Sequence, residues 1–191
     1  MARVGFIVDE MFEDSELRVP LDRVRAAGHE SVVIGLKQGK HLVGKKHEVS
    51  IDTDVAIDDV SADSLDALVI PGGYSPDYLR TDEGMVDLVC DMVEAGKPVA
   101  AICHAGWMLA EAGVVANRTV TSWRSIKTDL ENAGAKWVDR EVVEDENVIT
   151  SRKPDDLPAF CEALLKQIAA DPTKKVAKKN GAQSSRSSAR S

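Results

Sequence analysis

The sequence has few of the residues that mark disulfide-rich or membrane-spanning proteins. Only three of its 191 residues are cysteine, and Cys90, Cys103 and Cys161 lie far apart. An odd and sparse set of cysteines predicts reduced thiols in a cytoplasmic protein rather than a disulfide framework. No apolar run approaches the roughly 20 residues that a membrane helix needs, and the N-terminus has no signal-peptide apolar region. We therefore expect no membrane partner.

Metal-binding and nucleotide-binding motifs are also missing. His29, His41 and His47 are scattered through turn-like segments, and their spacing from the cysteines matches no zinc pattern. The chain has neither a Walker loop nor a Gly-rich dinucleotide loop. The sequence thus predicts no metal ion and no cofactor.

Positive charge is scarce outside the C-terminus. The net charge is −8, but residues 172–191 hold six basic and no acidic side chains, which leaves 18 basic and 32 acidic side chains, or −14, for the rest. An acidic body binds nucleic acid poorly, so we expect at most a weak contact through the basic tail. With only 4% aromatic residues, the composition gives no support to a chaperone-like role either. Residues 1–171 predict a single domain, and the Ser-, Lys- and Arg-rich tail at 172–191 is expected to be flexible.

Short apolar runs alternate with amphipathic segments along the domain. Strands are predicted at 3–9, 30–36, 65–70, 99–103, 119–121, 138–143 and 148–151, with a hairpin between 37 and 54. Helices are predicted at 14–28, 76–95, 104–113, 125–133 and 157–171. Repeated β-α-β units imply a mostly parallel sheet with right-handed crossovers, so the fold class is an α/β sandwich with helices on both faces.

Cys103 lies where a buried strand passes directly into a helix. A thiol at this junction faces the positive end of the helix, which favours the thiolate. A strand-turn-helix junction also lifts a side chain above the sheet edge, as in a nucleophile elbow. His104 can accept a proton or lend its backbone N–H to an oxyanion hole, with the Gly73 N–H as second donor. The alternative is that Cys103 is a small core residue, as we expect for Cys90 and Cys161.

Two further loops should reach the same edge of the sheet. The acidic loop at 9–14 follows the first strand, and the glycine-containing loop at 72–77 follows the third. Ligands of such sheets bind at the carboxyl ends of the strands. One carboxyl of the acidic loop can therefore reach the thiol and tune its pKa, although composition does not say which one.

Three motifs, taken together, carry a family resemblance. AICHAG at 101–106, PGGYSPDYLR at 71–80 and DEMFEDSELRVP at 9–20 resemble the DJ-1/PfpI superfamily, and most closely its PfpI-like branch. The resemblance extends from Arg3 to about Ile168. It implies a flavodoxin-like, class I glutamine amidotransferase-like three-layer sandwich with a mostly parallel central sheet and a nucleophile elbow. It also implies a homodimer or higher homo-oligomer.

The resemblance further assigns roles to individual residues. It implies that Cys103 is the nucleophile, His104 its neighbouring histidine, and Glu13 the glutamate that contacts the elbow. Asp77 corresponds to an acidic residue that a neighbouring subunit contributes, and the oxyanion-hole amides correspond to Gly73 and His104. Five residues are expected to line the pocket: Gly72, Tyr74, Ala105, Trp107 and Trp123.

The expected function is that of a cytoplasmic stress-response protein with a reactive cysteine. One hypothesis is a cysteine hydrolase that acts on carbonyl adducts, as deglycases and glyoxalases do, or on small peptides, as a PfpI-type protease does. The other is a non-enzymatic sensor of oxidative stress that works through oxidation of Cys103.

Overall fold

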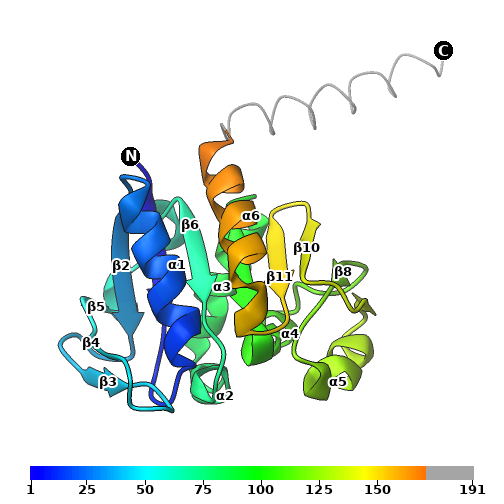
Figure 1. Ribbon diagram of the computed structural model, residues 1–191, viewed down its shortest axis with the longest axis horizontal. Coiled ribbons are helices and arrows are strands. Elements are labelled where there is room, and N and C mark those ends of the chain that lie inside the picture. Colours follow the sequence, from blue (N-terminus) through cyan, green and yellow to red (C-terminus); the bar gives the residue numbers. More distant parts are fainter. Residues whose placement is uncertain (171–191) are drawn as a thin grey trace.

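A seven-stranded sheet forms the middle layer of the computed structural model, which describes residues 1–170 (Figure 1). Its strand order is β10-β11-β7-β6-β1-β2-β5, and every neighbouring pair is parallel except β10 and β11. The strands of this sheet are β1 (Arg3–Ile7), β2 (Glu30–Gly35), β5 (Val55–Ala56), β6 (Ala67–Ile70), β7 (Val99–Ile102), β10 (Val142–Asp145) and β11 (Val148–Ser151). The predicted mostly parallel α/β sandwich is confirmed.

Helices cover both faces of the sheet, and two small strand pairs flank it. The helices are α1 (Asp14–Ala26), α2 (Ser75–Leu79), α3 (Glu83–Glu94), α4 (Gly106–Glu111), α5 (Lys127–Asn132) and α6 (Leu157–Ala169). The small pairs are the antiparallel hairpin β3 (His41–Val43) with β4 (Ser50–Asp52), and the parallel pair β8 (Thr119–Val120) with β9 (Lys136–Trp137). No helix within residues 1–170 is long and apolar enough to cross a membrane. The predicted tail at 172–191 lies outside the described residues.

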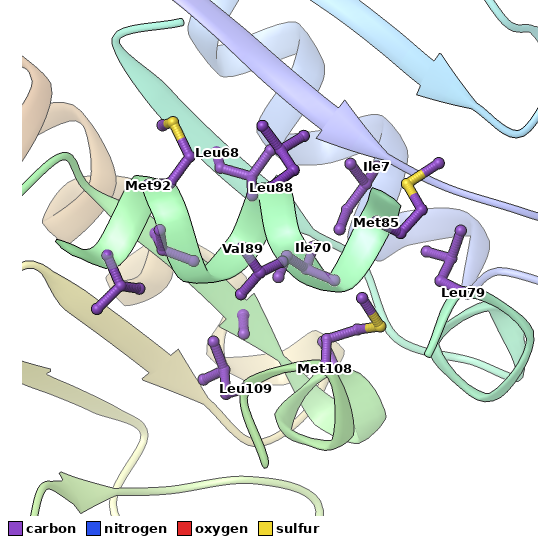
Figure 2. Close-up of a cluster of buried hydrophobic side chains, with 14 of the residues drawn as sticks. Ile7, Leu68, Ile70, Leu79, Met85, Leu88, Val89, Met92, Met108 and Leu109 are labelled. Carbon is purple, nitrogen blue, oxygen red and sulfur yellow. The ribbon is translucent and has the colours of Figure 1, made fainter. Parts of the chain in front are cut away.

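Alternation along the strands divides the core into two layers. On β6, Ala67 and Val69 face α1 and α6, whereas Leu68 and Ile70 face α3 and α4. Figure 1 shows α1 and α6 together on one side of the sheet. Figure 2 shows the opposite layer, in which side chains of α3 and α4 pack on Ile7, Leu68 and Ile70. The central strands β6, β7 and β11 are buried at every residue, as expected of a parallel sheet covered by helices.

Two sequence-predicted elements are divided in the structure. The helix predicted at 76–95 is two helices, because the chain leaves α2 after Leu79 and Asp82 then caps α3 by accepting the Met85 N–H at 3.0 Å. The strand predicted at 138–143 is replaced by β9 and β10. Between them, Asp139 lies in the connection and pairs with Arg152 at 2.7 Å.

Cys90 is a correction to the predicted core. It is only half-buried on α3, and its thiol donates to Glu94 Oε1 at 3.8 Å. Cys161, by contrast, is buried in the α1–α6 layer as predicted.

Candidate active site

Cys103 has a backbone conformation that few residues adopt. It follows β7 directly and has φ +63°, in the left-handed region that side chains with a Cβ rarely occupy. The chain then forms a 3-10 turn at Cys103–Ala105 and continues as α4. This sharp strand-turn-helix junction is the predicted elbow geometry, and strain of this kind gathers at functional sites.

Glu16 is the carboxyl that meets the thiol. It is fully buried on the first turn of α1, and its Oε2 accepts the Gly72 N–H at 2.9 Å. Its Oε1 accepts no N–H or O–H hydrogen within residues 1–170, and the Cys103 thiol hydrogen-bonds to the carboxyl. Burial, with a contribution from the nearby Glu13 charge, raises the pKa of Glu16 to about 8. Glu16 is therefore largely a neutral acid at pH 7 and can donate a proton at the sulfur.

The assignment of the elbow contact to Glu13 is a correction. Glu13 precedes α1, and its two oxygens pair with Lys45 at 2.6 Å and Lys46 at 2.8 Å. Burial alone would raise the pKa of Glu13, but hydrogen bonds and charge from the two lysines outweigh it and lower that pKa. Glu13 is therefore a buried, ionised residue that pairs with Lys45 and Lys46.

Both lysines come from the hairpin loop between β3 and β4. Asp14 fixes this loop, because its carboxylate accepts the backbone N–H groups of Lys46, Glu48 and Val49 at 2.8 to 2.9 Å. Lys45 also interacts electrostatically with Cys103, favouring the thiolate. By fixing the loop between β3 and β4, Asp14 holds the charged Lys45 side chain near the Cys103 thiol.

Two glycines let the loop after β6 approach the thiol. A Cβ added at Gly72 would lie 2.6 Å from Glu16 Oε2 and 2.7 Å from the Cys103 Cβ, so a larger residue would force this carboxyl and thiol apart. Gly73 has φ +79° and pairs in a β-bridge with Phe12. The N–H groups of Gly73 and His104 point at the Cys103 sulfur and favour its ionised form.

Burial dominates the titration of the thiol. Burial and the Glu16 charge raise the pKa of Cys103 to about 12, against the opposing effect of the two amides and Lys45. The sequence expectation of a thiolate favoured by the helix end is therefore not met in the single chain. A charge on Glu16 disfavours the Cys103 thiolate, whereas the hydrogen bond from the Cys103 thiol favours the ionised Glu16 carboxylate. Burial outweighs that hydrogen bond, so both groups are protonated at pH 7.

His104 is in contact with the thiol. Its Nδ1 lies 3.2 Å from Cys103 Sγ, and its Nε2 lies 3.1 Å from Ser125 Oγ. Burial lowers the pKa of His104, and the Lys45 charge lowers it further, so the neutral imidazole is favoured. Sequence reasoning did not identify Glu16 or Ser125 as part of this site.

Asp77 lies apart from His104 in the single chain. It is exposed on α2 and lines a surface groove of about 770 Å³. Arg80 lines the same groove, pairs with Glu111 at 2.7 Å and lies 5.6 Å over the Trp107 ring. A contact between Asp77 and His104 would require a second subunit and stays a prediction.

The five predicted pocket residues occupy different environments. Gly72 lies against the thiol, and Trp107 packs beside His104 with ring centroids 5.3 Å apart. Tyr74 and Trp123 are exposed by 58% and 42% and remain candidates for contact with a ligand. Ala105 is a correction, because it is fully buried in the α3 layer and cannot form a pocket wall.

No cluster of three or more His, Cys, Asp or Glu side chains in the described chain could hold a metal ion.

The fold and the elbow define a flavodoxin-like α/β protein with a cysteine at the usual position of a nucleophile. The sequence matches the DJ-1/PfpI family over residues 2–167. The chain therefore belongs to the DJ-1/PfpI family.

Two curated relatives and one solved structure are similar over most of the chain. The chain is 45% identical over 169 residues to protein/nucleic acid deglycase 2 of Escherichia coli, covering 88% of this chain and 98% of that protein. It is 40% identical over 166 residues to deglycase PfpI of Pyrococcus furiosus, covering 87% and 99%. The crystal structure of Drosophila melanogaster DJ-1beta superposes with a TM-score of 0.81 at 30% identity, covering 93% of this chain and 96% of that one.

Proposed function

We propose that this protein is a cysteine-dependent hydrolase that acts on 2-oxoaldehydes and on their adducts with amines. The single observation that supports this proposal most strongly is the surroundings of Cys103. Its sulfur lies at a strained elbow, with two amide donors, the buried acid Glu16 and a neutral His104 around it. The deglycase names of two relatives at 45% and 40% identity support the same chemistry.

The chemistry begins with removal of the thiol proton by His104 Nδ1. The sulfur then bonds to the aldehyde carbon, and the C=O electron pair moves to oxygen, where the N–H groups of Gly73 and His104 stabilise it. Glu16 gives its proton to this oxygen, and the resulting carboxylate takes the hydrogen from the sulfur-bearing carbon, while His104 gives the former thiol proton to the neighbouring carbonyl oxygen, which forms an enediol. Glu16 then returns its proton to the neighbouring carbon and takes the hydroxyl proton of the sulfur-bearing carbon, which converts the enediol into a thioester and restores Glu16 and His104. Water hydrolyses the thioester, so the product is a 2-hydroxy acid and the thiol is regenerated. For an amine adduct, the C–S bond forms at the carbon whose C–N bond breaks, and the amine leaves with the proton that His104 took from the thiol.

The test is turnover of three substrate classes by wild-type protein and by two matched variants. Methylglyoxal, a methylglyoxal-treated amine and a short peptide represent the carbonyl, adduct and protease alternatives. We expect Cys103→Ala to abolish turnover, whereas Cys161→Ala, which removes a second buried thiol, retains it. Undiminished turnover in Cys103→Ala would refute the hydrolase proposal, and preferential turnover of the peptide would favour the protease-type reaction.

The cellular setting that we propose is a homodimer acting in the cytoplasm during stress. Met11, Tyr74 and Tyr78 are exposed apolar side chains beside Asp77, which supports burial of this surface by a second copy. All three cysteines are free, which supports a reducing compartment.

A second candidate function is a sensor that reports oxidation of Cys103. Glu16 Oε1 accepts no N–H or O–H hydrogen among the described residues, so the protonated carboxyl is available to donate to a sulfinate oxygen. Peptide mass mapping after mild peroxide treatment tests this role. We expect added oxygen on Cys103, and preferential oxidation of Cys90 or Cys161 would count against a sensor.

A further inference from the structure

A serine from a distant part of the chain meets His104 on the side of the ring opposite the thiol. The imidazole bridges two groups, with Nδ1 at 3.2 Å from Cys103 Sγ and Nε2 at 3.1 Å from Ser125 Oγ. We propose that Ser125 is a positioning residue that holds the His104 ring with Nδ1 directed at the Cys103 thiol. This proposal deepens the hydrolase function and rests on Cys103 being its nucleophile.

A hydroxyl suits both protonation states that His104 must pass through. In the neutral ring that accepts the thiol proton, Nε2 carries the hydrogen and donates to Ser125 Oγ, which leaves the Nδ1 lone pair for the S–H proton. When that proton moves to Nδ1, the S–H electron pair stays on sulfur as the thiolate. Nε2–H still donates to Ser125 Oγ, so the same contact orients the ring before and after the transfer. A neutral hydroxyl achieves this without the rise in histidine basicity that a carboxylate partner would cause.

The chain on both sides of Ser125 is fixed to the elbow. The Trp123 N–H donates to the Cys103 carbonyl at 3.2 Å. On the other side, Ile126 is only 1% exposed and packs against α4. A Cβ added at Gly106 on this helix would come within 3.1 Å of Ile126 Cδ1. Ser125 itself is exposed, so these two neighbours, rather than its own burial, set the position of its hydroxyl.

Trp107 restrains the His104 ring from a second direction. The two rings are tilted by 56° with centroids 5.3 Å apart. Trp107 Nε1 donates to Asp129 Oδ2 at 2.8 Å, on α5 and four residues beyond Ser125. The segment from Trp123 to Asp129 therefore supports both the histidine and the aromatic ring beside it.

Cys103, His104 and Ser125 of one chain are thus linked in series, with Ser125 as the partner of the histidine. The alternative partner for His104 is Asp77 of a neighbouring subunit, a contact that the single chain does not make. The two alternatives predict different reactivities for Cys103. Removal of the Ser125 hydroxyl should lower the reactivity of the thiol only if this hydroxyl orients the His104 ring.

The experiment measures alkylation of Cys103 by iodoacetamide between pH 5 and pH 9, in the full-length protein, by peptide mass mapping. We expect Ser125→Ala to lower the rate constant at pH 7 about tenfold and to remove the inflection that His104 gives to the pH profile. Ser125→Thr, which keeps the hydroxyl, should restore both. Thr128→Ala is the matched control, because it removes an exposed hydroxyl three residues away on α5, and it should react like wild type.

The same measurement in a His104→Ala background separates positioning from a general effect on folding. We expect Ser125→Ala to have no further effect there, because the ring that it orients is gone. Wild-type reactivity in Ser125→Ala, an equal loss in the His104→Ala background, or a loss produced by Asp77→Ala instead would each overturn the proposal. Alkylation requires no substrate, so a failure of Ser125 in this assay is distinct from a failure of the hydrolase proposal, which the Cys103→Ala turnover assay decides.

Discussion

Two buried thiols of this chain have similar exposure and opposite surroundings. Cys103 is 8% exposed and Cys161 is 2% exposed, and burial raises the pKa of Cys103 to about 12 and of Cys161 to about 11. Cys161 lies on α6 within an apolar layer formed by residues such as Leu21 and Leu164. Around Cys103, two amides, a histidine, a lysine and a buried acid meet at one strained residue.

The comparison shows that two similarly buried thiols can have different polar partners. Water is excluded from both sulfurs, which disfavours the charge on each. Only Cys103 has donors aimed at the sulfur and a neighbouring group that can take its proton. The reactivity that we propose for Cys103 therefore depends on these polar partners, and removing them one at a time should make it behave like Cys161.

Removal of the Glu16 proton donor should have the largest effect. Glu16→Gln keeps an oxygen that can accept the Gly72 N–H but cannot shuttle a proton, so we expect turnover to fall by about 100-fold or more. Glu13→Gln is the matched control, three residues away at the same helix start, and loses only the Lys45 and Lys46 ion pairs. These pairs are partly exposed, and we expect a change of severalfold at most.

Steady-state kinetics with a 2-oxoaldehyde, together with Cys103 alkylation rates, measure this difference. A larger loss in Glu13→Gln than in Glu16→Gln would contradict the structural assignment of the carboxyl. It would restore the assignment that the sequence resemblance favours.

The confusion between the two glutamates shows where sequence information ends. Glu13 and Glu16 are three residues apart at the start of α1, and residues with this spacing lie on the same side of a helix. The local sequence pattern therefore does not show which of the two glutamates meets the thiol. The choice is made by the loop between β3 and β4, some 30 residues further on, whose lysines bind Glu13 and leave Glu16 to the buried site.

Elements with a strong periodic pattern were predictable for a physical reason. The continuous apolar runs of β1, β6 and β7 and the apolar stripe of α6 follow from burial of each element in the core, which the sequence records directly. The place of Cys103 follows from strand and helix order alone. The His104–Ser125 contact joins residues 21 apart in the sequence, and no local signal records such a tertiary contact.

The effect of pH on stability gives a smaller test of the difference between Glu16 and Glu13. The unfolded chain ionises Glu16 near its ordinary pKa of 4.5, whereas the folded protein keeps the proton until about pH 8. Between these values the folded state binds more protons, so the free energy of unfolding should fall as pH rises. For Glu13 the folded pKa is lowered, so its contribution is present above pH 4.5 and is lost only on acidification.

Thermal unfolding at pH 5 and pH 8 measures these opposite contributions. We expect Glu16→Gln to reduce the loss of stability over this range and to raise the unfolding temperature at pH 8 by roughly 5 °C, which corresponds to ~2 kcal/mol. Glu13→Gln should keep the wild-type dependence on pH between these two values. If Glu16→Gln keeps the full wild-type decline, Glu16 is already ionised in the folded protein at neutral pH. The neutral acid beside Cys103, which distinguishes that thiol from Cys161, would then be absent at pH 7.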